Sequence, residues 1–135
     1  EIMPPTESDA TMAELEARHA AKLPFKVKRA PKGDHEAKAL SIHIELGRPD
    51  DDPALDALRT LFDAWGGVLR LGAFPGPEPY PSSVGYVESV EPALAHEVIV
   101  EIEHLFGTDA AWDPIYRGLA RIHADICPIR EVRFQ

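Results

Sequence analysis

Two stretches of the chain decide its fold: DPALDALRTLFDAWGGV at residues 52–68 and DPIYRGLARIHADICPI at residues 113–129. Counted from each proline, the positions +2, +5, +8 and +15 are apolar or aromatic in both stretches. They are Leu55, Leu58, Leu61 and Val68 in the first stretch, and Tyr116, Leu119, Ile122 and Ile129 in the second. An Asp-Pro pair followed by apolar residues at helical spacing is typical of a helix start. We therefore expect helices over 53–65 and 113–124.

Strand-like segments flank both expected helices. The segments 40–46 and 97–103 precede them, and 68–73 and 129–134 follow them. Two such β-α-β units predict an α+β domain with the ferredoxin-like, split β-α-β plan, in which both helices cover one face of an antiparallel sheet.

Shorter segments complete the expected domain organisation. Residues 84–89 favour a further strand, and residues 25–29 favour an edge strand that forms a hairpin with 38–46. Residues 10–22 favour a short N-terminal helix. We therefore expect a tail and helical extension over 1–24, followed by a single α+β domain over 25–135.

Two of the local features leave alternatives. Residues 94–106 fit a helix or a strand, and the β-branched run Val98-Ile99-Val100 favours a strand. Asp52 is the expected N-cap of the first helix, which Gly66-Gly67 should end. Asp109 and Asp113 both fit the N-cap of the second helix. Asp113 is preferred, because a cap at Asp109 would place Pro114 inside the helix.

Composition narrows the functional classes. The chain of 135 residues fits one domain, and it contains neither a membrane-length apolar run nor a signal-peptide pattern. A single cysteine, Cys127, excludes an internal disulfide framework and indicates a reducing cytoplasm. The net charge of −9 falls entirely on residues 39–135. Such an acidic body disfavours nucleic acid and favours a basic partner protein.

Alternation on two expected strands places polar residues opposite the apolar ones. Glu45 then shares an open sheet face with Glu97, Glu101 and Glu103, and His43 joins them. One histidine with several carboxylates could bind a divalent cation or do acid–base work. The preferred interpretation is a solvated polar face, because alternation alone produces this pattern. We therefore predict no metal site and no cofactor.

Other candidates carry weaker signals. Tyr80 lies within the proline-rich segment 75–81, where it either anchors a partner or folds back onto the core. Cys127 is interpreted as a packed small hydrophobe rather than a nucleophile. The remaining candidates are histidines with no metal-binding spacing: His96, His104 and His123. The sequence contains no nucleotide-binding, zinc-protease or hydrolase motif, so no catalytic residue is predicted.

These observations favour a non-enzymatic cytoplasmic protein-binding module with an acidic binding face. Its sharpest form is a bacterial immunity protein or antitoxin that neutralises a cognate toxin. Two alternatives remain: a small enzyme or ligand-binding or metal-binding domain that uses the open sheet face, and a homodimeric structural module joined through sheet edges or faces.

Overall fold

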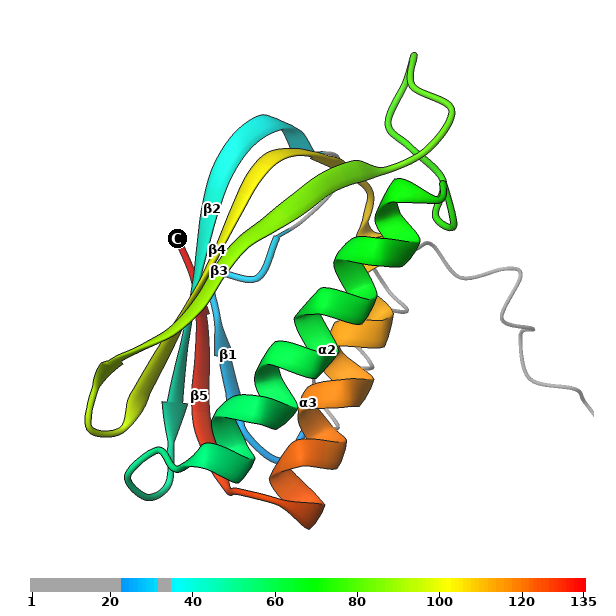
Figure 1. Cartoon of the computed structure of the whole chain (residues 1–135). Coiled ribbons are helices and arrows are strands. Elements are labelled where there is room, and N and C mark those ends of the chain that lie inside the picture. Colours follow the sequence, from blue (N-terminus) through cyan, green and yellow to red (C-terminus); the bar gives the residue numbers. More distant parts are fainter. Residues whose placement is uncertain (1–22, 32–34) are drawn as a thin grey trace, which may run out of the picture.

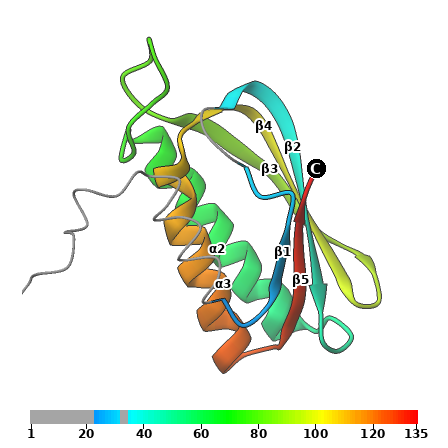
Figure 2. The ribbon, with the colours of Figure 1, turned by 180° about the vertical axis from the view of Figure 1, so that it is seen from behind.

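A five-stranded mixed sheet with two helices packed on one of its faces forms the framework of this α+β protein (Figures 1 and 2). The computed structural model describes residues 23–31 and 35–135. Its elements are β1 (Lys26–Lys28), β2 (His35–Leu46), α2 (Asp52–Arg70), β3 (Val84–Leu94), β4 (Glu97–Gly107), the 3-10 turn η2 (Asp109–Trp112), α3 (Asp113–Asp125) and β5 (Ile129–Phe134). The helix expected at 10–22 and most of the tail expected at 1–24 lie outside the described residues.

The strand order is β1-β5-β2-β4-β3. The pairs β5-β2, β2-β4 and β4-β3 are antiparallel, whereas β1 runs parallel to β5. The expectation of a purely antiparallel sheet is therefore wrong. The hairpin expected between 25–29 and 38–46 is also wrong, because β5 separates these two segments. The parallel pairing sets Val27 beside Val132 and gives Lys28 a 3.1 Å ion pair with Glu131, a partner on β5.

The first helix is longer than the sequence indicates. It extends through Gly66-Gly67 to Arg70, so the strand expected at 68–73 is wrong. Leu69 continues the apolar stripe of α2 one turn beyond Trp65, and its side chain is fully buried. The glycines lower helix propensity by about 1 kcal/mol each, and burial of this last turn offsets that loss. The strand that follows α2 is β3, which contains the expected segment 84–89.

The helix starts also differ from expectation by small amounts. The N-cap of α2 is Asp51 rather than Asp52, and its Oδ1 accepts a 2.9 Å hydrogen bond from the backbone N–H of Ala54. The second helix continues directly from η2, with no side-chain hydrogen bond at its cap. Asp113 therefore does not act as the expected N-cap, and it forms a 2.9 Å ion pair with Arg117 instead.

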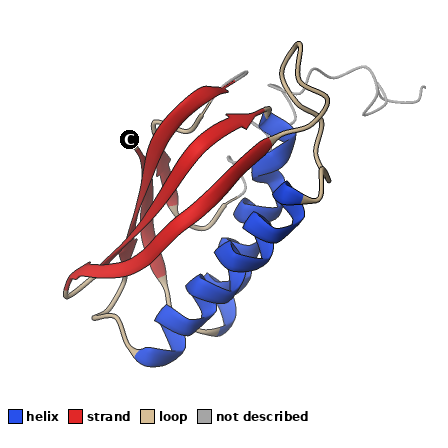
Figure 3. Ribbon diagram, turned by 45° about the horizontal axis from the view of Figure 1, so that its top comes forward, coloured by secondary structure: helices blue, strands red, loops and turns tan. Residues whose placement is uncertain are grey.

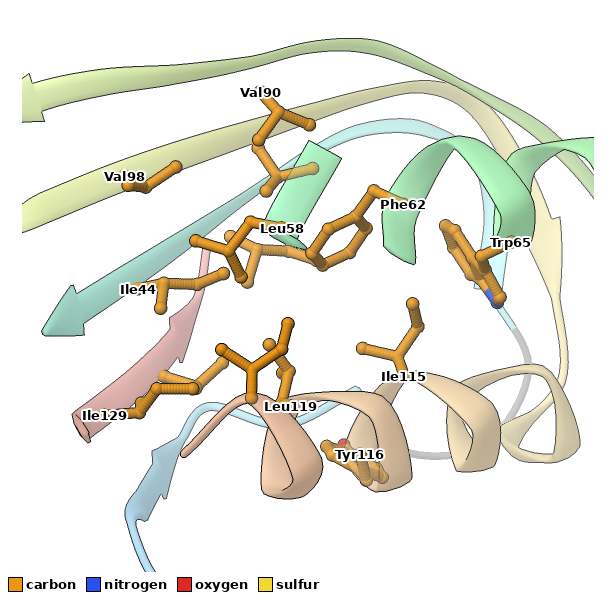
Figure 4. Close-up of a cluster of buried hydrophobic side chains, with 14 of the residues drawn as sticks. Ile44, Leu58, Phe62, Trp65, Val90, Val98, Ile115, Tyr116, Leu119 and Ile129 are labelled. Carbon is orange, nitrogen blue, oxygen red and sulfur yellow. The ribbon is translucent and has the colours of Figure 1, made fainter. Parts of the chain in front are cut away.

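The core lies between the sheet and the two helices. Residues 97–107 form a strand, as the β-branched run predicted, and the side chains of Val98, Val100 and Ile102 are fully buried. Side chains from both layers point toward one another in Figure 4: Ile44, Val90, Val98 and Ile129 from the strands, and Leu58, Phe62, Trp65, Ile115 and Leu119 from the helices. Because every strand with an alternating pattern gives its apolar side to this layer, its polar side is left on the opposite face of the sheet.

Candidate functional site

The sheet face opposite the helices is the candidate site, and no described element covers it (Figures 1 and 3). We call it the open face. Its side chains come from all five strands: Lys26 and Lys28 of β1, Glu131 and Arg133 of β5, Ser41, His43 and Glu45 of β2, Glu97, Ile99, Glu101 and Glu103 of β4, and Tyr86, Glu88 and Ser89 of β3.

Four carboxylates expected to converge do share this face. Glu45 lies directly opposite Glu97 in the β2–β4 pairing, and Glu101 and Glu103 lie further along the same side of β4. This arrangement follows from the period of two along each strand, which needs only the correct register to bring the residues together.

Two neighbours on β2 fix the direction of the β4 carboxylates. The Ser41 hydroxyl donates a 2.7 Å hydrogen bond to Glu101 Oε2, its direct partner across the strands. His43 Nδ1 lies 3.3 Å from Glu97 Oε1. Both carboxylates are thus held at the face before any partner arrives, which reduces the side-chain entropy that binding would cost.

Glu88 is a member of the cluster that the sequence analysis missed. A hydrogen bond with the Glu103 side chain, followed by repulsion from the same carboxylate and, more weakly, from Glu101, raises the pKa of Glu88 above its ordinary value. The pairing of β3 with β4 shifts register between Val87 and Ser89, which places Glu88 beside the β4 carboxylates. Alternation from Tyr86 could have indicated this face for Glu88, but only with β3 already paired to β4.

The opposite edge of the open face is basic. Lys28 Nζ and Arg133 Nη1 lie 3.1 Å and 3.3 Å from the two carboxylate oxygens of Glu131. The hydrogen bond from Lys28 is the largest cause that lowers the pKa of Glu131; the charges of Lys28, Arg133 and Lys26 act in the same direction, and burial opposes them. The open face thus has its cations on β1 and β5 and most of its carboxylates on β3 and β4.

Histidine and cysteine side chains were the other candidates for a metal ligand or a nucleophile. Within 23–31 and 35–135, no group of three or more His, Cys, Asp or Glu side chains is placed to hold a metal ion. Cys127 is fully buried, as predicted for a packed residue, and its Sγ accepts a 3.4 Å hydrogen bond from Arg48 Nε. His123 Nδ1 accepts a 2.9 Å hydrogen bond from the backbone N–H of Ile129, so this ring has a structural role at the junction of α3 and β5.

The proline-rich loop lies away from the carboxylates. Tyr80 is 45% exposed, so it does not fold back fully onto the core. Hydrogen bonds to the Pro75 carbonyl from Ser83 (2.6 Å) and Thr108 (2.9 Å) fasten the base of the loop. The loop projects beyond the C-terminal end of α2, on the helix side of the sheet in both views (Figures 1 and 2). The structure therefore does not join Tyr80 to the open face.

In comparisons with known proteins, no family model, curated protein or solved structure matches the chain. Among the helices of the described part of the chain, none has the length and apolar character needed to cross a membrane.

Proposed function

We propose that this chain is a non-enzymatic protein-binding module whose open face binds a positively charged partner protein. The observation that carries the proposal is the grouping of Glu88 with Glu101 and Glu103 on an uncovered sheet face, where a hydrogen bond with Glu103 and then repulsion from the same carboxylate raise the pKa of Glu88. A lysine or arginine placed between them would relieve that repulsion. Glu45, Glu97 and Glu101 extend the same negative potential along β2 and β4.

A cluster of carboxylates would affect the rate of association with a partner and the stability of the complex in different ways. Exposed ion pairs are individually weak, typically below about 1 kcal/mol, so scattered surface charges would not suffice. A concentrated field accelerates association with an oppositely charged partner, and pairs that become desolvated at the interface contribute more. The orientation of Glu101 by Ser41 and of Glu97 by His43 favours such pairs.

The two sheet edges favour docking on the face rather than strand addition. The edge strand β1 has three residues, two of them lysines. The other edge strand, β3, shows three register irregularities against β4 and contains Pro92. Short length, lysine, proline and bulges are the features that discourage a further strand from pairing. A partner would therefore meet the open face between these edges.

A bacterial immunity protein or antitoxin acting in the cytoplasm is the sharpest form of this proposal. Toxins that act on nucleic acid present basic surfaces to phosphate groups, and an acidic protein can cover such a surface. The carboxylate cluster of β3 and β4 supplies the complementary charge. Two alternatives remain. The open face could bind a small ligand or a metal ion, or the chain could form a structural homodimer.

The strand arrangement also supports a finer description of the fold. In the order β5-β2-β4-β3 each strand is antiparallel to its neighbour, and each half of the chain runs strand, helix, strand. We infer that this part follows the ferredoxin-like plan, with β1 as an added parallel edge strand. Amide NMR contacts that pair β2 directly with β3 would overturn this assignment.

The test compares two double charge reversals of equal size. Glu101→Lys/Glu103→Lys changes the open face, and Asp56→Lys/Asp63→Lys makes the same charge change on solvent-facing positions of α2. A partner captured by the wild-type chain from its own cell extract is identified, purified and titrated with all three proteins by calorimetry. We expect the open-face variant to lose at least tenfold in affinity, about 1.4 kcal/mol, and the α2 variant to lose much less.

Three outcomes would count against the proposal. Equal losses in both variants would mean that only net charge matters. Affinity that does not fall with rising salt would remove the electrostatic basis. A thermal shift on addition of divalent metal ions, with no protein partner captured, would favour the ligand-binding alternative.

A further inference from the structure

The open face carries opposite charge at its two sides, and this division constrains what can dock there. Toward β4 and β3 lie the carboxylates of Glu97, Glu101, Glu103 and Glu88. Toward β1 and β5 lie three cations, Lys26, Lys28 and Arg133, around Glu131, and Glu45 of β2 lies opposite Glu131 on the same face. The basic side therefore keeps an excess of positive charge after its internal ion pairs are formed.

The strand registers place residues from both sides of the open face in one row across the sheet. Lys28 lies opposite Arg133, Arg133 opposite His43, and His43 opposite Ile99 on β4. Neighbouring strands are about 4.8 Å apart, so β1 lies about 14 Å from β4 and about 19 Å from β3. This separation exceeds the Debye length of about 8 Å at physiological salt, so the two charges act on a partner as distinct sites.

The basic side remains accessible to an anion. The Lys28 side chain is 59% exposed although its ammonium group pairs with Glu131, and Lys26 is exposed beside it. Arg133 Nη1 is held by Glu131, whereas its Nε is buried with no hydrogen-bond partner among the described residues. Glu131 and Glu45 balance these three cations only in part, so a carboxylate arriving from a partner would meet an excess of positive charge.

We propose that the open face binds a bipolar partner surface in one fixed orientation. The partner places lysine or arginine over Glu88, Glu101 and Glu103, and places aspartate or glutamate over Lys26 and Lys28. This inference rests on the proposed function and names the partner's charge pattern. A uniformly basic surface would gain at β3 and β4 but meet repulsion at β1, and a bipolar surface turned end for end would be repelled at both sides.

Two synthetic peptides test whether the basic side of the open face attracts negative charge on a partner. The bipolar probe has four lysines at one end and four glutamates at the other, joined by three Gly-Ser repeats that span about 13 Å on average. The basic probe is the same peptide with four glutamines in place of the glutamates. Each labelled peptide is titrated into the full chain by fluorescence anisotropy at about 150 mM salt, where the Debye length of about 8 Å is shorter than the distance between the two sides.

The variant for these titrations is Lys26→Glu/Lys28→Glu. Its control is Arg117→Glu/Arg121→Glu, which makes the same charge change on exposed positions of α3, away from the open face. Because the reversal in β1 removes the Lys28–Glu131 ion pair, the neutral variant Lys26→Gln/Lys28→Gln is measured alongside it. Circular dichroism verifies that each variant is folded.

The expected effects of the variant on the two probes have opposite signs. Lys26→Glu/Lys28→Glu should weaken binding of the bipolar probe at least threefold and tighten binding of the basic probe. The α3 control should not weaken the bipolar probe. The neutral variant should weaken the bipolar probe in the same direction as the reversal, by a smaller factor.

The outcomes separate this inference from the proposed function. If both probes tighten in the Lys26→Glu/Lys28→Glu variant, the partner need only be basic, and the bipolar inference is overturned while the proposed function stands. If neither probe responds to Glu101→Lys/Glu103→Lys, the proposed function fails as well. The absence of measurable binding of both probes to the wild-type chain would overturn both.

Discussion

Trp65 donates its indole N–H to the backbone carbonyl of Ala111 over 2.7 Å, and this buried hydrogen bond joins the two halves of the chain. The ring of Trp65 also lies 5.0 Å from that of Trp112, measured between centroids. Trp65 belongs to α2, whereas Ala111 and Trp112 belong to the turn that leads into α3. The bond therefore fixes the start of the second helix against the first.

Replacing Trp65 by phenylalanine should test this link. Trp65→Phe retains an aromatic ring but removes the only donor of the side chain, so the Ala111 carbonyl loses this buried partner. We expect a loss of about 1–3 kcal/mol in the free energy of unfolding, measured by urea denaturation. A loss below about 0.5 kcal/mol would show that the carbonyl finds another donor.

The glycines of the two helices provide a second test. A Cβ at Gly67 would have no atom within 4 Å, so Gly67→Ala should stabilise α2 by about 0.5–1 kcal/mol. A Cβ at Gly118 of α3 would collide with Leu61 Cδ1, so Gly118→Ala should gain less or destabilise, because Leu61 must move. Thermal melts of the two variants measure the difference. Destabilisation by Gly67→Ala would mean that α2 ends before this residue.

Large-to-small changes in the core form the third prediction. Leu58 and Leu119 have no exposed side-chain surface and lie among the buried side chains of Figure 4. Leu58→Ala and Leu119→Ala should each cost about 2–5 kcal/mol. Leu71→Ala serves as the control, because Leu71 is 85% exposed and should change stability by less than about 0.5 kcal/mol. Denaturant melts in which Leu119→Ala behaves like the control would contradict the placement of α3.

The N-cap of α2 distinguishes two adjacent aspartates. Asp51→Ala should cost about 1 kcal/mol, because it removes the acceptor for the Ala54 N–H. Asp52→Ala removes only a favourable charge in the first helical turn and should cost less. Equal losses from the two substitutions in urea melts would argue against Asp51 as the cap.

The two perturbed carboxylates predict opposite dependences of stability on pH. The pKa of Glu88 is raised, so its deprotonation disfavours the folded state, and stability falls as pH rises from the ordinary value of 4.5 through the raised one. The pKa of Glu131 is lowered, so its contribution is present above 4.5 and is lost as pH falls through the lowered value.

Replacing each of these glutamates by glutamine tests the predicted pH dependence of stability. Glu88→Gln should raise the melting temperature relative to wild type at neutral pH more than at acid pH. Glu131→Gln should lower it at neutral pH and have less effect in acid. Melting temperatures recorded between about pH 3 and pH 7 provide the comparison. A Glu88→Gln effect that does not change with pH would remove the carboxylate pair as its cause.

The sequence alone determined what depends on local periodicity. The α+β class, the existence of both helices, and the assignment of Glu97, Glu101 and Glu103 to one side of a strand all follow from apolar spacing. Each of these patterns repeats within a few residues along the chain, so no knowledge of distant neighbours is needed. The same pattern placed Glu45 with the other carboxylates once its strand was recognised.

Only the tertiary structure decided where α2 ends and which strands pair, because both depend on contacts between distant parts of the chain. Gly66-Gly67 is typical of a helix end, but burial of Leu69 carries α2 past it. The partner of β1 is a strand about a hundred residues away, and its pairing with β5 creates the basic side of the open face. Glu88 reaches Glu103 only through a register shift between β3 and β4. These contacts join segments far apart in the chain, and local propensity carries no information about them.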